Sequence, residues 1–139
     1  VLVSTHVLRE YDRGTILKNL LGLIPDKKKM RFHKKVETTL LDLYETIGGI
    51  DLAVIDGTYT YLGSALDKVI KTNILLVGRD AIAVEAVGAA LVGLDPEKMP
   101  VIQEAMKRGF GEGNIKKIEV LGNSIESIKK NIISKCQKK

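Results

Sequence analysis

Four short aliphatic runs, set among helix-like segments, constrain the fold of this 139-residue chain more than any other feature. The runs are "VLV" at 1–3, "DLAVI" at 51–55, "ILLVG" at 74–78 and "KIEVL" at 117–121. Each is nearly continuous in hydrophobicity, as buried parallel strands tend to be. Strands that alternate with helices are typical of layered domains. We therefore predict an α/β domain with a mainly parallel four-stranded sheet flanked by helices, in which the first three strands are largely parallel.

Two longer segments predict the main helices. Residues 34–47 place Val36, Leu40, Leu43 and Ile47 on a single apolar stripe, as an amphipathic helix requires. Residues 81–93 are apolar almost all round, so we expect this helix to be the most buried one. Shorter helices are expected at 16–21, from the Asp95-Pro96 pair onward, and at 124–134.

The length suits one α/β domain over residues 1–139, because a chain of this size can bury about two thirds of its unfolded surface. With 45% hydrophobic and 28% charged residues, the chain is globular rather than disordered. It begins without Met, so we expect it to be a fragment of a longer domain.

The formal net charge of +5 comes from two basic segments. Residues 27–35 hold six Lys or Arg and residues 129–139 hold five, with no acid in either. The other eleven basic residues face 17 acidic ones, so the rest of the domain is acidic. With four Tyr, two Phe and no Trp, the chain also has few rings on which bases could stack. Nucleic-acid binding is therefore not expected.

The compartment is predicted from what the sequence lacks. No apolar run approaches the roughly 20 residues of a bilayer helix, so we expect no membrane association. The chain opens without a secretory signal pattern. Its single cysteine, Cys136, can form no internal disulfide and cannot alone ligate an iron–sulfur cluster, which takes about four thiolates. These features favour a cytoplasmic protein.

Polar residues follow the first three predicted strands. They are Ser4, Thr5 and His6, then Asp56, Gly57 and Thr58, then Arg79 and Asp80. Ligands of open α/β sheets bind at the carboxyl ends of parallel strands, where these groups would meet. Each also has a structural interpretation: Asp80 can cap a helix, Asp56 can start a turn, and His6 can bond a neighbouring loop.

The Lys18-Asn19 pair lies on the polar side of the predicted 16–21 helix, whose apolar residues would anchor it. A lysine beside an asparagine suits a carboxylate or phosphate ligand. We expect Thr5, Lys18, Asn19, His33 and Arg79 to bind the ligand. His6 or His33 could donate a proton, and Asp56 or Asp80 could act as a base or a hard-cation ligand. The sequence thus predicts that His6, Lys18, Asn19, Asp56 and Asp80 line one cleft.

Glu85 must find a cation or a hydrogen-bond donor, or stay protonated, because it lies within an apolar helix. Arg79 is the simplest partner. The "GFGEGN" stretch at 109–114 follows a helix, so it reads as a turn rather than a phosphate loop. The common hydrolase, zinc and nucleotide motifs do not occur, and neither a metal nor a cofactor is assigned.

The basic segment "DKKKMRFHKK" at 26–35 has two interpretations. Its cations repel one another, so it should be a solvated surface loop. Alternatively it is a lid that closes over an anion held by Lys18 and brings His33 near it.

Several of these stretches together resemble the later part of the prokaryotic family called domain of unknown function 362. They are "VSTHV", "LKNLLGLIPD", "LLDLYE", "LAVIDG" and the region from "GRDAIAVEAVG" to "IEVLG". The most specific pieces are Lys18, Asn19 and Gly22, and the helix start Asp80, Ala83 and Glu85, where the family usually has Asp at the last position. Members commonly carry a ferredoxin-like iron–sulfur module, and the family is distantly similar to nickel-dependent lactate racemases.

Two functions follow from the residues and this resemblance. The first is an enzyme-like domain that binds a small anionic ligand or cofactor at the carboxyl ends of the strands. The alternative is a non-catalytic module that docks a redox, ferredoxin-like iron–sulfur protein partner through its basic segment. The substrate, the reaction and the metal are not encoded in any motif of the chain.

Overall fold

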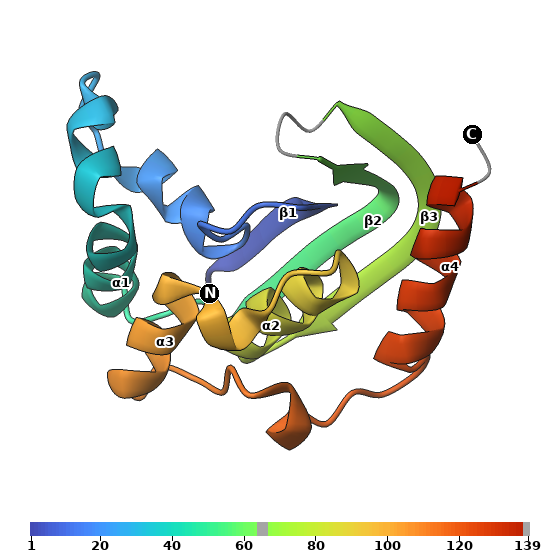
Figure 1. The fold of residues 1–139 in the computed structure, drawn as a ribbon. Coiled ribbons are helices and arrows are strands. Elements are labelled where there is room, and N and C mark those ends of the chain that lie inside the picture. The colour runs from blue at the N-terminus through green and yellow to red at the C-terminus, as the bar shows by residue number, and fades with distance from the viewer. Residues whose placement is uncertain (64–66, 138–139) are drawn as a thin grey trace.

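Three strands form one mixed sheet in the computed structural model, which describes residues 1–63 and 67–137. The strands are β1 (Val3–Arg9), β2 (Leu52–Leu62) and β3 (Lys68–Gly78), in the order β1-β2-β3. β1 and β2 are parallel, whereas β2 and β3 are antiparallel (Figure 1). The α/β class is therefore confirmed, but the expected parallel arrangement of the first three strands is wrong for β3.

The antiparallel pairing follows from a short connection. Only five residues, 63–67, separate β2 from β3, whereas a parallel pair needs a crossover of about a dozen residues or more. The sequence analysis ended the second strand at 55 and began the third at 74. The β-branched and aromatic residues of "GTYTYL" and "KVIKTN" extend both strands toward this connection.

The fourth predicted strand is also wrong. Residues 115–117 form the 3-10 helix η4 (Ile115–Lys117), and residues 118–121 join no ladder with the strands that the structure describes. This segment instead runs from η4 toward the last helix (Figure 1).

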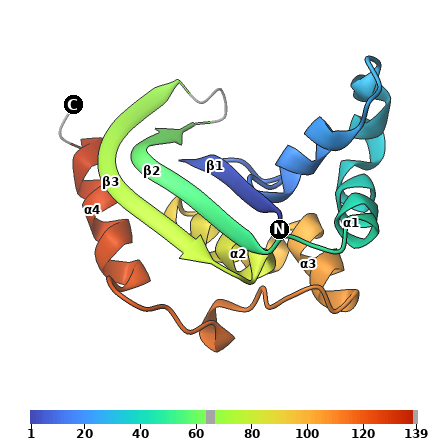
Figure 2. The same ribbon diagram turned by 180° about the vertical axis from the view of Figure 1, so that it is seen from behind.

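Helix α2 (Ala81–Leu91) covers one face of the sheet, and Figure 2 shows the strands in front of it from the opposite side. All its residues except Ala83 are buried, as predicted. The other α-helices and 3-10 helices are η1 (Leu17–Leu23), η2 (Lys29–Lys35), α1 (Val36–Thr46), η3 (Pro96–Lys98), α3 (Pro100–Lys107) and α4 (Ile125–Gln137).

The core lies between α2 and the sheet. Leu8 of β1 and Ile55 of β2 are both at most 1% exposed. Gly88 allows the close approach, because a Cβ at this position would lie 2.7 Å from the Cδ1 atom of Ile55. The helix therefore sits directly on the strands that carry the candidate site.

Candidate anion-binding site

Helix η1 is fastened along the outer edge of β1. The Asn19 side-chain amide donates to the Thr5 carbonyl at 2.7 Å and to the Ser4 hydroxyl at 3.1 Å. The Ser4 hydroxyl in turn donates to the Ile16 carbonyl at 3.1 Å. Asn19 therefore holds the helix against the strand, and its neighbour Lys18 is fixed in position by that contact.

Glu85 of α2 holds the start of the same helix, η1, through hydrogen bonds. Its carboxylate accepts from the Thr15 amide at 2.6 Å, from the Thr15 hydroxyl at 2.7 Å and from the Leu17 amide at 3.0 Å. The side chain is 1% exposed, and burial raises its pKa even though these donors lower it. The need for donors is confirmed, but the partner is this turn rather than Arg79.

Gly14 allows the turn that precedes this anchor. Its φ of +90° is favourable only for glycine. The chain can thus turn tightly after β1 and present the Thr15 and Leu17 donors to one carboxylate.

Two cations share the ring of Tyr11, just beyond the end of β1. The Lys18 ammonium lies 4.0 Å from the ring centroid and donates to the Tyr11 hydroxyl at 2.7 Å. The guanidinium carbon of Arg9 lies 4.7 Å from the same centroid. Neither cation takes part in an ion pair within residues 1–63 and 67–137. Arg9 Nε is buried and has no hydrogen-bond partner among these residues.

His6 lies within the field of these cations. Its Nδ1 atom is 3.0 Å from the Val7 carbonyl, so the tautomer that donates from Nδ1 leaves Nε2 as an acceptor. Burial lowers the pKa of His6, and the charges of Arg9 and Lys18 lower it further. Burial likewise lowers the pKa of Arg9. The imidazole is therefore neutral near pH 7, and it is influenced by two cations that make no ion pair among the described residues, although the charge of Glu85 acts to raise the pKa of Arg9.

Asp56 does not join this group. His6 is in register with Ile55, and Asp56 is in register with Val7, so alternation places His6 and Asp56 on opposite faces of the sheet. The exposed Asp56 carboxylate accepts from the Thr58 amide and hydroxyl, and these bonds lower its pKa.

Arg79 and Asp80 lie at the other end of the sheet. Because β3 is antiparallel, its last residue, Gly78, is in register with Ala53 near the start of β2. Asp80 accepts from the amides of Ile82 and Ala83 at 2.9 Å, as an N-cap does, and from the Glu112 amide at 2.9 Å. The structure therefore does not bring these residues to His6 and Lys18.

Thr5 and Asn19 line a shallow pocket of 330 Å³ at the edge of β1.

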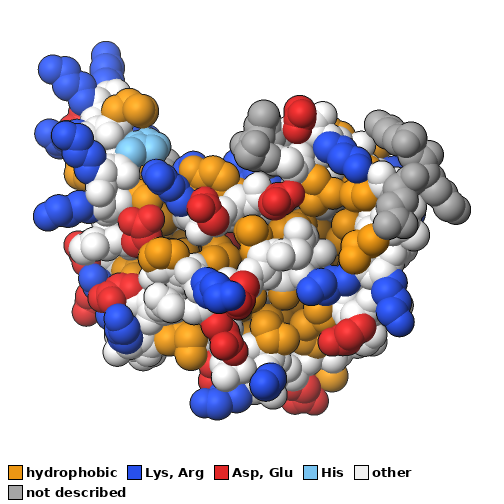
Figure 3. All heavy atoms as spheres, in the orientation of Figure 1, with side chains coloured by type: hydrophobic (Ala, Val, Ile, Leu, Met, Phe, Trp, Pro, Cys, Tyr) orange, Lys and Arg blue, Asp and Glu red, His pale blue; other side chains and the backbone are white. Residues whose placement is uncertain are grey.

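His33 lies on η2, where its Nδ1 atom is buried without a partner among the described residues. The basic segment around it is not the expected loop but a 3-10 helix. The Asp26 carboxylate explains the order, because it pairs with Arg31 at 2.5 Å and accepts from the Lys28 amide at 2.7 Å. Figure 3 shows Lys and Arg side chains gathered over this basic segment.

The sequence analysis missed Arg9, Tyr11 and Thr15. It ended the first strand at residue 3, whereas β1 continues to Arg9, so the residues that follow the strand belong to "EYDRGT". The signal was present in "VLVSTHVLR", a longer β-type run, and in Gly14, which marks the turn before η1.

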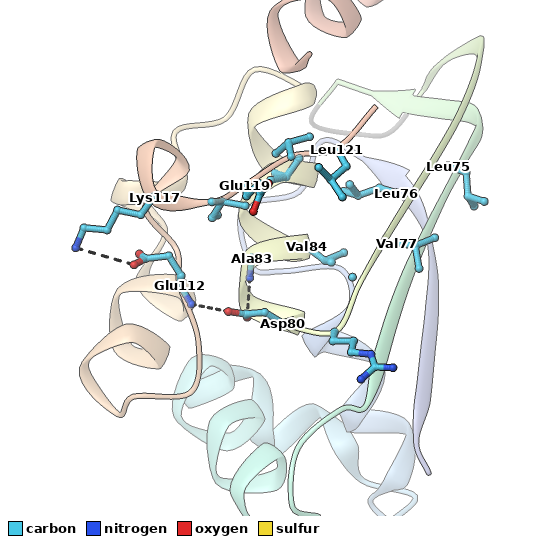
Figure 4. A pocket seen from close by; sticks show the side chains of 15 residues that line it. Leu75, Leu76, Val77, Asp80, Ala83, Val84, Glu112, Lys117, Glu119 and Leu121 are labelled. Atoms are coloured by element: carbon cyan, nitrogen blue, oxygen red, sulfur yellow. Dashed lines mark hydrogen bonds and ion pairs between the residues drawn. The ribbon is translucent and has the colours of Figure 1, made fainter. Parts of the chain in front are cut away.

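A larger pocket lies elsewhere, between β3, α2 and residues 112–121. It has a volume of 580 Å³ and contains Arg79 and Asp80 among its lining residues. In Figure 4, Leu76 and Val77 belong to the β3 side, Ala83 and Val84 to α2, and Glu119 and Leu121 to the facing segment.

Within residues 1–63 and 67–137, no group of three His, Cys, Asp or Glu side chains is placed to hold a metal ion. The helices of this same part of the chain are all too short or too polar to cross a bilayer.

Comparison with known families matches residues 5–90 to the family described as "Domain of unknown function (DUF362)". This region contains β1, η1, β2, β3 and nearly all of α2, and with them the Lys18, Asn19 and Glu85 positions. Comparisons with curated proteins and with solved structures gave no match. Since the matched region is more than half of the chain, the protein belongs to the DUF362 family.

Proposed function

We propose that this domain binds a small anionic ligand or cofactor through Arg9, Lys18 and His6 at the carboxyl end of β1. The observation that carries the proposal is the pair of cations that share Tyr11 without a carboxylate partner among the described residues. Like charges held together raise the local positive potential, and a bound anion lowers the energy of that arrangement.

Each residue supplies a different interaction. Arg9 offers a planar fork that matches carboxylate or phosphate oxygens, and Lys18 adds a compact charge. His6 is the group of this site whose protonation a bound anion can change, because the anion would offset the positive charges of Arg9 and Lys18 that lower its pKa. This set suits an enzyme-like role in which His6 exchanges a proton with an anion held by the two cations.

A thermal-shift titration with sodium sulfate tests this function. Sulfate stabilises many proteins by exclusion from their surfaces, so the informative quantity is the difference between variants. The wild type should gain more Tm from sulfate than from sodium chloride of equal ionic strength, and Lys18→Gln should lose most of this extra gain. Lys116→Gln, a change at an exposed lysine outside the site, should keep it. Equal gains in the two variants would contradict the proposal.

The alternative is a docking module for a ferredoxin-like protein. It is supported by the basic helix η2, whose cations surround Met30, a side chain that is 76% exposed. A negatively charged ferredoxin should then bind, and replacing Lys27, Lys28 and Lys29 by Gln should weaken binding and flatten its salt dependence. Lys18→Gln should leave that binding unchanged. The opposite pattern would exclude η2 as the docking surface.

A further inference from the structure

The outer edge of β3 is open and chemically unprotected. β3 pairs with β2 on one side, and no described strand pairs with its other side. Residues 74–78, "ILLVG", contain neither a charge nor a proline, two usual protections of an exposed edge. The strand is interrupted only before them, where Asn73 has a φ of +54° and the register against β2 shifts. The edge of β1, by contrast, is covered by η1 through Asn19 and Ser4.

A groove runs along this open edge. The pocket of 580 Å³ adjoins a second one of 360 Å³, and the two share residues of β3, of α2 and of the facing segment, namely Leu75, Leu76, Val87, Val120 and Leu121. The floor is α2 and the walls are β3 and residues 118–121 (Figure 4). Leu121 is 84% exposed, so the apolar wall opposite β3 faces solvent, whereas Leu75, which is 68% exposed, points away from α2 on the other face of the sheet (Figure 4).

The segment that faces β3 across the groove has a strand-like sequence but pairs with no described strand. Residues 117–121, "KIEVL", are β-type in sequence, and Ile118 has extended backbone angles of −85° and 121°. The unpaired edge of β3 therefore offers backbone amides and carbonyls to a segment beside it, whereas the Ile118 amide of the facing wall already donates to the Ile115 carbonyl. An extended peptide satisfies such groups along its whole length, which a compact apolar molecule cannot do.

Charge further defines the occupant. Asp80 is occupied by three backbone amides, and the Glu112 carboxylate lies 4.0 Å from the Lys117 ammonium. Glu119 makes no hydrogen bond or ion pair within residues 1–63 and 67–137 and is exposed beside the groove. The lining also contains Arg79, which makes no ion pair within residues 1–63 and 67–137, so only the part of the groove beside Glu119 complements a basic side chain.

We propose that this groove binds an extended peptide segment of a partner protein, which adds as a strand to the edge of β3. Its alternate side chains are aliphatic and face α2, and a lysine or arginine lies beside Glu119. Residues 74–78 of β3 form the regular part of this edge, which spans about 16 Å, so a peptide strand of similar length fits. The proposal does not depend on the anion site, since the groove lies along the opposite edge strand.

Fluorescence anisotropy with a defined peptide series tests it. The series has the pattern Lys-Val-Thr-Val-Thr-Val-Thr, with Ile, Leu or Phe at the Val positions. Members should bind the wild-type chain, and Leu121→Lys and Glu119→Lys should each weaken binding at least about fivefold. Ile133→Lys, a change at another exposed apolar residue, should have no effect because α4 carries it outside the groove.

Peptides with alternate backbone amides N-methylated keep their side chains but lose half of their donors, so they should not bind. Absence of binding by the whole series, or equal binding by the methylated peptides, would overturn the proposal. Sedimentation of the protein without peptide tests whether a second copy of this chain occupies the groove instead. A dimer that Leu121→Lys dissociates would assign the edge to a second copy of this chain.

Discussion

A single carboxylate, Glu85, determines where the candidate site sits. It joins the middle of α2 to the Thr15–Leu17 turn, about 70 positions earlier in the chain, and so fixes the helix that carries Lys18.

Glu85→Ala should destabilise the fold by about 3 kcal/mol, because it leaves three donors without an acceptor in a buried space. Thr15→Ala removes one of these bonds and should cost about 1 kcal/mol. Urea unfolding followed by circular dichroism measures both values. A loss for Glu85→Ala no greater than that for Thr15→Ala would show that the carboxylate is not an anchor.

The pH dependence of stability provides a second test of Glu85. Burial raises its pKa above the ordinary value of 4.5, so the folded state binds more protons than the unfolded state between 4.5 and the raised pKa. The free energy of unfolding therefore falls as pH rises through this window. Glu85→Gln should lack this component. A wild-type minus Glu85→Gln difference that stays constant, or that rises with pH in this window, would be inconsistent with the buried carboxylate.

The sequence could predict that Glu85 needs hydrogen-bond donors, but not which residues supply them. An acid among apolar helical residues requires donors, and the sequence shows that much. The donors proved to be backbone amides of a distant turn, which carry no residue-specific signature. Likewise, Asn19 could be chosen as polar, but its bond to the Thr5 carbonyl depends on how η1 lies on β1.

Among the elements, α2 was the most predictable and the β2–β3 hairpin the least. The uniformly apolar sequence of α2 allows only a buried helix. The hairpin strands instead mix Thr, Tyr and Lys with aliphatic residues, because parts of them are exposed to solvent. Their aliphatic halves alone look like separate parallel strands. Because of this error, the sequence analysis predicted Arg79 and Asp80 at the wrong end of the sheet.

Contact between α2 and the sheet should be sensitive to volume at Gly88. Gly88→Val should destabilise the protein by about 1–3 kcal/mol, since its Cβ would overlap Ile55. Gly22→Val is the matched control, because nothing lies within 4 Å of a Cβ added there. Denaturant midpoints of the two variants give the comparison. Equal midpoints would mean that α2 does not approach β2 this closely.

For the molecule as a whole, the candidate site is built at one edge of the sheet rather than across its strand ends. β1 supplies His6 and Arg9, the turn after it supplies Tyr11, and η1 supplies Lys18. A parallel sheet would have collected residues from three strands, as the sequence analysis assumed. The mixed sheet leaves one compact cationic group at the β1 edge and a separate groove at the β3 edge.

The central claim is that His6, Arg9 and Lys18 form one anion site, and the titration of His6 followed by NMR tests it most directly. Sulfate keeps its charge across the titration. At constant ionic strength, saturating sulfate should raise the pKa of His6, which burial and the two cations now lower, by about one pH unit. Lys18→Gln should reduce this effect. A His6 titration that is the same with and without sulfate would contradict the account.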